Sequence, residues 1–145
     1  MKYIIIFLIF TGLLHSCKNN DQSQIINQNN KNLSANFKES IKRGEEIYSS
    51  FCVTCHMPNG KGVPNSFPPL ANSDYLKNNR TKSIKAIKYG MSEEIVVNGK
   101  TYNMPMAALG LSNDEVSDVM NYITNSWGNE NLEAITPQEV SEIKP

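Results

Sequence analysis

Apolar residues near the middle of the chain follow helical spacing and predict a helix that begins near residue 37. The positions are separated by four, three, four and three residues, which describes one face of a helix: Phe37, Ile41, Gly44, Tyr48 and Phe51. A glycine inside such a stripe costs about 1 kcal/mol relative to alanine. Gly44 therefore indicates that the backbone of another element approaches closely.

A second stripe near the C-terminus predicts a final helix that ends at Gly128. Ser112 and Glu115 have the spacing of a capping box, which marks a helix start. The apolar positions that follow are Val116, Val119, Met120, Ile123 and Trp127. We expect this helix to cross the first one at Gly44, with the large aromatic side chain of Trp127 closing the core. Residues 129–145 are weakly patterned and are expected to form a tail.

The region between these helices mixes loop, helix and hairpin signals. Residues 57–70 contain four prolines and two glycines, which favours a loop. Residues 74–89 predict a helix that ends at Gly90. Residues 95–102 place Asn98-Gly99 between two β-prone runs, which predicts a hairpin with a type I′ turn.

Five basic residues without an intervening acid occur within the predicted helix 74–89. They are Lys77, Arg80, Lys82, Lys85 and Lys88. Such a run forms either a docking patch for an acidic partner or a solvated helix face. The whole chain has 14 basic and 14 acidic residues and a formal net charge of zero, so no basic excess suggests nucleic acid.

The N-terminus has the features of an export signal. Lys2 precedes an apolar run from Tyr3 to Leu14, which is shorter than the roughly 20 residues that span a bilayer. Leu14-His15-Ser16-Cys17 resembles a bacterial lipobox, which implies a signal peptide over 1–16 and lipidation of Cys17. The alternatives are an ordinary signal peptide or an uncleaved anchor. Residues 17–36 are rich in Asn and Gln and are expected to be a flexible tether, followed by one domain over 37–145.

The sequence Cys52-Val53-Thr54-Cys55-His56 reads C-x-x-C-H, the attachment signature of a c-type haem. Each thiol adds to one vinyl group of the porphyrin, and the adjacent imidazole becomes the proximal ligand of the iron. The alternatives are a redox-active cysteine pair or part of a zinc site. A structural zinc site needs about four ligands, and this segment supplies three.

The proximal histidine needs a partner for its second ring nitrogen, and the iron has a sixth coordination position. We expect a backbone carbonyl near Pro68 or Pro69 to hold the His56 ring, although these prolines could simply stiffen a turn. The domain has no second histidine, so the sixth position falls to a methionine, a lysine, a partner's residue, water or nothing.

Four regions supply methionines that could occupy this position. Met57 is too close to His56 in sequence, Met120 lies in the final helical stripe, and Met91 follows a helix end. Met104 and Met106 follow the hairpin on an irregular segment, which suits them to present a side chain; the alternative is that both fill gaps in the core.

Together these features resemble a class I cytochrome c over residues 37–128. The resemblance implies an all-α fold of about three to five helices around one covalently bound haem c, with a small β-hairpin before the methionine loop. Gly44 and Tyr48 match the family's helix crossing, with Val119 and Tyr122 opposite. In this family the axial methionine is often followed by proline, which selects Met104 over Met106. The resemblance thus implies Cys52, Cys55, His56 and Met104 as haem-binding residues, with His56 and Met104 as iron ligands.

The implied function is electron transfer rather than catalysis. We expect a monomeric monohaem carrier, held by a lipid on Cys17 in the cell envelope, on the periplasmic or outer side of a membrane. It would shuttle single electrons between respiratory partners by Fe(II)/Fe(III) cycling during transient docking. The alternatives are a haem subunit of a dehydrogenase, oxidase or reductase complex, or a haem enzyme or sensor with an open sixth position.

Overall fold

The computed structural model describes the backbone of residues 21–145 and the side chains of residues 34–145. The predicted signal peptide and Cys17 lie outside the described residues. Leu33–Pro145 form one unit of the structure, and this unit carries the features discussed below.

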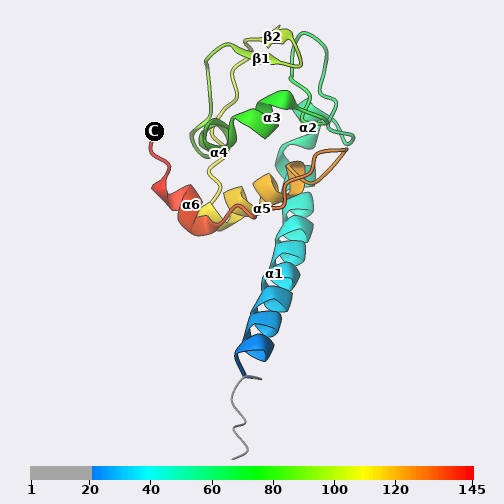
Figure 1. The fold of residues 1–145 in the computed structure, drawn as a ribbon. Coiled ribbons are helices and arrows are strands. Elements are labelled where there is room, and N and C mark those ends of the chain that lie inside the picture. Colours follow the sequence, from blue (N-terminus) through cyan, green and yellow to red (C-terminus); the bar gives the residue numbers. More distant parts are fainter. Residues whose placement is uncertain (1–20) are drawn as a thin grey trace, which may run out of the picture. The chain divides into compact units, whose positions relative to one another are not determined.

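The described backbone contains six helices and one antiparallel hairpin, which confirms the predicted mainly helical class (Figure 1). The elements are α1 (Asp21–Phe51), α2 (Val53–His56), α3 (Asp74–Asn78), α4 (Arg80–Tyr89), β1 (Ile95–Val97), β2 (Lys100–Tyr102), α5 (Asn113–Ile123) and α6 (Pro137–Glu142). The helix count exceeds the predicted three to five because the sequence analysis did not predict the short helices α2 and α6 as separate elements. In addition, Asn79 adopts a non-helical conformation (φ −130°, ψ 49°) that divides the predicted helix 74–89 into α3 and α4.

Helix α1 begins further toward the N-terminus than its apolar stripe predicts. It starts at Asp21, so a large part of the segment expected to be a flexible coil has a helical backbone. The sequence from residue 21 to residue 43 contains neither glycine nor proline. Once a helix has formed, each further residue adds one hydrogen bond at little cost, so extension through this tract needs no apolar face.

The predicted crossing of α1 and α5 at Gly44 is confirmed. A Cβ atom at Gly44 would meet the backbone carbonyl of Asp118 and lie 2.8 Å from the Cβ of Tyr122. One turn later on α1, the Tyr48 ring packs against Tyr122 and Trp127, with centroid distances of 5.5 and 4.9 Å. Trp127 thus helps to close the core, as expected.

A buried polar network holds α1 and α5 together beside this crossing. The carboxylate of Asp118 accepts hydrogen bonds from Ser40 Oγ at 2.6 Å and from Arg43 Nε at 2.6 Å. Asn121 Nδ2 donates to Ser40 Oγ at 2.8 Å. Because a buried carboxylate is stable only when paired, these bonds specify one rotation of α5 against α1.

Local signals at the hairpin and at the start of α5 are also confirmed. Asn98 and Gly99 both have positive φ angles (51° and 74°), as a type I′ turn requires. Ser112 and Glu115 form the predicted capping box. However, α5 ends at Ile123 rather than near Gly128, because the chain turns from Thr124 onward and Trp127 takes a positive φ of 52°.

The prediction of a loose tail over residues 129–145 is wrong. Ile135 and Val140 are 2% and 0% exposed, and α6 packs against α5. Asn121 fixes the segment by exchanging two hydrogen bonds with the backbone of Ile135, at 2.9 and 2.7 Å. Arg80 pairs with Glu139 at 2.6 Å. Ile135 and Val140, five positions apart, form no recognisable stripe. The helix start is nevertheless marked by Thr136, whose side chain accepts from Glu139 N, and by Pro137 in the first turn, a local signal that the prediction of a tail missed.

Among the described residues, no helix is both long enough and apolar enough to cross a bilayer.

We predict that Gly44→Ala destabilises the domain although alanine is the better helix former. The added methyl group overlaps the Asp118 carbonyl, so α1 and α5 must separate, at a cost of about 2–3 kcal/mol in the free energy of unfolding. Thermal denaturation of the haem-loaded protein measures the change. Lys42→Ala, at an exposed position of α1, serves as the control. A higher melting temperature for Gly44→Ala would contradict the close crossing.

We predict that docking of α6 weakens in acid. The hydrogen bond from Arg80 lowers the pKa of Glu139 below its ordinary value of 4.5. A carboxylate with a lowered pKa stabilises the fold above its unfolded pKa and loses this effect as the pH falls. The melting temperatures of the wild type and Glu139→Gln should therefore differ most near neutrality and converge below about pH 4.5. Glu142→Gln, at an exposed neighbouring position on α6, serves as the control.

Candidate functional site

The C-x-x-C-H segment continues directly from the last turn of α1. Cys52 N donates to the Tyr48 carbonyl at 2.9 Å, and His56 N donates to the Cys52 carbonyl at 2.9 Å. This short helix places Cys52 and Cys55 about one turn apart, and neither forms a disulfide. Burial, and to a lesser extent the nearby Cys55, raises the pKa of Cys52 to about 11.

The imidazole of His56 is fixed from behind by the proline-rich loop. Its Nδ1 atom lies 3.0 Å from the carbonyl oxygen of Pro68, which confirms the predicted type of acceptor. A proton on Nδ1 leaves Nε2 with a free lone pair, the form that ligates a metal. Burial lowers the pKa of His56, outweighing the opposite effect of the Pro68 hydrogen bond, and so favours the neutral ring.

Close backbone contacts within the loop bring Pro68 to this position. Gly62 N donates to the His56 carbonyl at 3.0 Å, and Gly62 has a positive φ of 62°. A Cβ atom at Gly62 would lie 2.6 Å from the Pro68 oxygen, so only glycine allows this approach. Tyr48 Oη donates to the Met57 carbonyl at 2.6 Å and ties the loop to α1.

His56 and Cys52 line two adjoining clefts with mostly apolar walls. Both clefts also share Pro68, Met91 and Met106. The inner cleft adds apolar side chains from α4, the hairpin and α5: Ile87, Val97, Val119 and Ile123. The outer cleft has a volume of about 310 Å³ and adds Phe51, Cys55, Phe67 and Met104. Free thiols, a neutral imidazole, thioethers and apolar walls in one place fit the predicted haem.

The structure separates the two methionines of the predicted ligand loop. Met106 is backbone-paired with Met91 through two N–H···O bonds of 2.8 Å, packs against the hydrophobic core and lines both clefts. Met104 is 52% exposed and lines only the outer cleft. In the sequence Met91 only follows a predicted helix end, and nothing there signals its backbone pairing with Met106.

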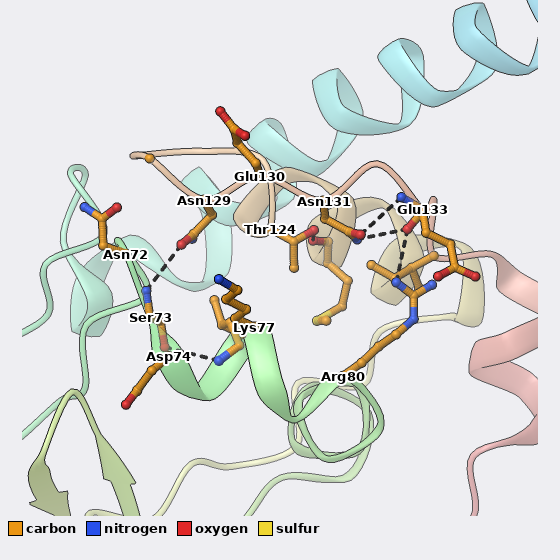
Figure 2. A pocket seen from close by; sticks show the side chains of 14 residues that line it. Asn72, Ser73, Asp74, Lys77, Arg80, Thr124, Asn129, Glu130, Asn131 and Glu133 are labelled. Carbon is orange, nitrogen blue, oxygen red and sulfur yellow. Dashed lines mark hydrogen bonds between the residues drawn. The ribbon is translucent and has the colours of Figure 1, made fainter.

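A further cavity, of about 660 Å³, is lined by many polar and charged side chains (Figure 2). It lies between α3 and the segment that follows α5, and Lys77, Arg80, Thr124, Asn129 and Glu133 contribute to its lining. Its polar groups bind one another: Asn129 Oδ1 accepts from Ser73 N at 3.3 Å, and Arg80 Nη1 donates to the Glu133 carbonyl at 3.0 Å. Neither the cysteines nor His56 line it, so it is separate from the predicted haem site.

A mainly helical domain with C-x-x-C-H at the end of its first helix, an anchored histidine and a methionine-lined apolar cleft defines a c-type cytochrome. The comparison with known proteins agrees, because residues 41–127 match the cytochrome c family. The chain belongs to this family.

Individual relatives support the same conclusion. Cytochrome c-552 of Thermus thermophilus is 34% identical over 107 residues, which cover 70% of this chain and 81% of that protein. Cytochrome c6 of Gracilaria tenuistipitata var. liui is 33% identical over 100 residues, covering 68% and 83%. The cytochrome c subunit of a quinone alcohol dehydrogenase from Gluconacetobacter polyoxogenes is 31% identical over 103 residues, covering 70% of this chain but 22% of that subunit.

Family membership establishes the cofactor and the kind of function. The protein carries covalently bound haem c and transfers electrons, and it is not an enzyme. When bound, the haem iron supplies one-electron exchange between its ferrous and ferric states.

Proposed function

We propose that this protein is a membrane-tethered monohaem electron carrier whose haem is linked to Cys52 and Cys55 and ligated by His56 and Met106. One observation carries this site assignment. Met106 and His56 line the same two apolar clefts, and one of these clefts also contains both thiols.

Burial and anchoring favour Met106 over Met104, the methionine selected by the family resemblance. A ligand that stays bound in both oxidation states must be held in one position, and the Met106 backbone is fixed by its two bonds to Met91. The Met104 side chain is half exposed. Met91 lines the same clefts but is not among the side chains that pack against the core, which makes it the second candidate.

The residues around the clefts support electron exchange by excluding water and limiting movement. Apolar walls such as Ile87 and Val97 disfavour the extra charge of ferric iron, and a thioether ligand raises the reduction potential further. At the mouth of the outer cleft, Phe51 and Met104 are 49% and 52% exposed. They provide an apolar surface on which a redox partner could dock briefly.

The proposed tether depends on the N-terminal sequence. The pattern Leu14-His15-Ser16-Cys17 supports lipidation of Cys17, and the polar segment up to residue 36 supports a spacer between lipid and domain. The carrier would then work in the cell envelope, on the periplasmic or outer side of a membrane, between donor and acceptor proteins of a respiratory chain.

A second candidate is a cytochrome subunit held permanently in a dehydrogenase complex. The similarity to cytochrome subunits of quinone alcohol dehydrogenases favours it. Gel filtration of detergent extracts separates the two proposals: a free carrier elutes near the size of the single chain, whereas a subunit co-elutes with a dehydrogenase.

We predict that Met106→Leu abolishes the weak far-red absorption band of thioether-ligated ferric haem, whereas Met104→Leu and Met91→Leu retain it. Leucine has a similar volume but offers no sulfur to the iron, so packing is largely preserved. Visible spectra of the purified haem proteins provide the measurement. Loss of the band in Met104→Leu alone would restore the family-based assignment, and loss in Met91→Leu alone would identify the third methionine.

We predict that Cys17→Ser moves the protein from the membrane fraction to the soluble fraction without loss of haem. Serine cannot carry the lipid thioether, while the haem-binding residues are unchanged. Fractionation, followed by haem staining and mass determination of the mature chain, tests this. Ser16→Ala leaves the cysteine in place and serves as the control. Membrane association that persists in Cys17→Ser with an intact leader would instead indicate an uncleaved anchor.

A further inference from the structure

Ser83 is a buried hydroxyl without a partner in the proposed haem cavity. It lies on α4, lines the inner cleft together with His56 and Met106, and is 4% exposed. Within the described part of the chain, its Oγ is the buried side-chain polar atom that makes no hydrogen bond. An unsatisfied buried hydroxyl is unfavourable, so its presence requires an explanation.

Other hydroxyls in or just after α5 are satisfied by local hydrogen bonds. Thr124 and Ser126 donate to the carbonyls four residues earlier, both at 2.7 Å, and Ser117 donates to the carbonyl three residues earlier at 2.7 Å. The corresponding acceptor for Ser83 is the Asn79 carbonyl, which accepts the Ser83 backbone N–H at 2.8 Å. The side chain makes no such bond, which leaves its proton available to a group in the cavity.

We propose that Ser83 Oγ donates a hydrogen bond to a propionate carboxylate of the bound haem. This inference rests on the proposal that the clefts beside His56 hold the haem. The porphyrin that fills an otherwise apolar cleft brings two carboxylates, which are strong acceptors, whereas a thioether sulfur is a weak one. A charge-assisted hydrogen bond from Ser83 would hold the propionate side of the haem in one position. It would act in addition to the thioether bonds to Cys52 and Cys55.

Ser83→Ala tests this through the sign of its effect on stability. If Ser83 holds a carboxylate, its removal leaves that carboxylate without a donor, and the melting temperature of the haem-loaded protein falls by about 5 °C. If the hydroxyl has no partner in the haem protein, its removal relieves an unsatisfied group and the melting temperature rises. Covalent attachment keeps the haem in the variant, so haem content and visible spectrum verify that the site itself is intact.

Infrared difference spectra between the reduced and oxidised protein provide a second readout. With haem labelled with ¹³C at its propionate carboxyl groups, the isotope-sensitive carboxylate band should shift in Ser83→Ala and be retained in Ser83→Thr, which keeps the hydroxyl. The reduction potential should fall, because a carboxylate that has lost its donor stabilises ferric iron more strongly. Ser117→Ala, a buried helical serine with a local partner, should change neither the band nor the potential.

Three outcomes would overturn the proposal. They are an unchanged carboxylate band, a higher melting temperature for Ser83→Ala, or loss of the thioether–iron band instead of a carboxylate shift, which would assign the hydroxyl to the methionine sulfur. Each of these can occur while Cys52, Cys55 and His56 still hold the haem. Failure of the haem-site proposal would appear independently. In that case the protein would keep its covalently bound haem after Cys52→Ala and Cys55→Ala.

Discussion

The contact between the α1 backbone and α5 at Gly44 positions the rest of the functional site. One turn beyond this contact, Tyr48 packs against Trp127 and donates to the Met57 carbonyl. The Tyr48 carbonyl in turn accepts the N–H of Cys52. Because a helix is stiff over such a short distance, the point at which α1 meets α5 determines where the cysteines enter the cleft. The paired carboxylate of Asp118 prevents α5 from rotating away.

On this helical frame, loops supply the two sides of the proposed iron site. The Pro68 carbonyl fixes His56 from one loop, and the antiparallel pair of Met91 and Met106 fixes the other. Backbone hydrogen bonds run through both loops, and the Tyr48 side chain adds a further bond to the first. An electron carrier benefits from this arrangement, since little movement on oxidation means little reorganisation during transfer.

The parts of the fold that the sequence predicted are those with a local cause. Three features can be recognised from neighbouring residues alone. They are the capping box of Ser112 and Glu115, the turn at Asn98-Gly99 and the glycine at the helix crossing. The docking of α6 against α5 and the choice between methionines depend on distant contacts. Val140 is buried because Arg80 and Asn121 hold the preceding chain against α5. Likewise, Met104-Pro105 matches a local family pattern. The backbone pairing of Met106 with Met91 nevertheless determines which methionine faces inward, and no short sequence pattern indicates this pairing.

Tertiary contacts also change the interpretation of the surface charge. The sequence has five basic residues in one run, yet Arg80 pairs with Glu139 and Lys88 Nζ donates to the carbonyls of Val140 and Ile143. These two residues therefore stabilise the C-terminal segment, and the patch that remains for a partner is smaller than the sequence indicates. For a chain with no net charge, long-range steering would contribute little to partner encounter. In the proposed carrier, confinement by a lipid raises the local concentration instead, and the apolar mouth of the cleft provides the short-range contact. In the proposed carrier, a tether and a weakly charged apolar docking surface are therefore complementary parts of one mechanism.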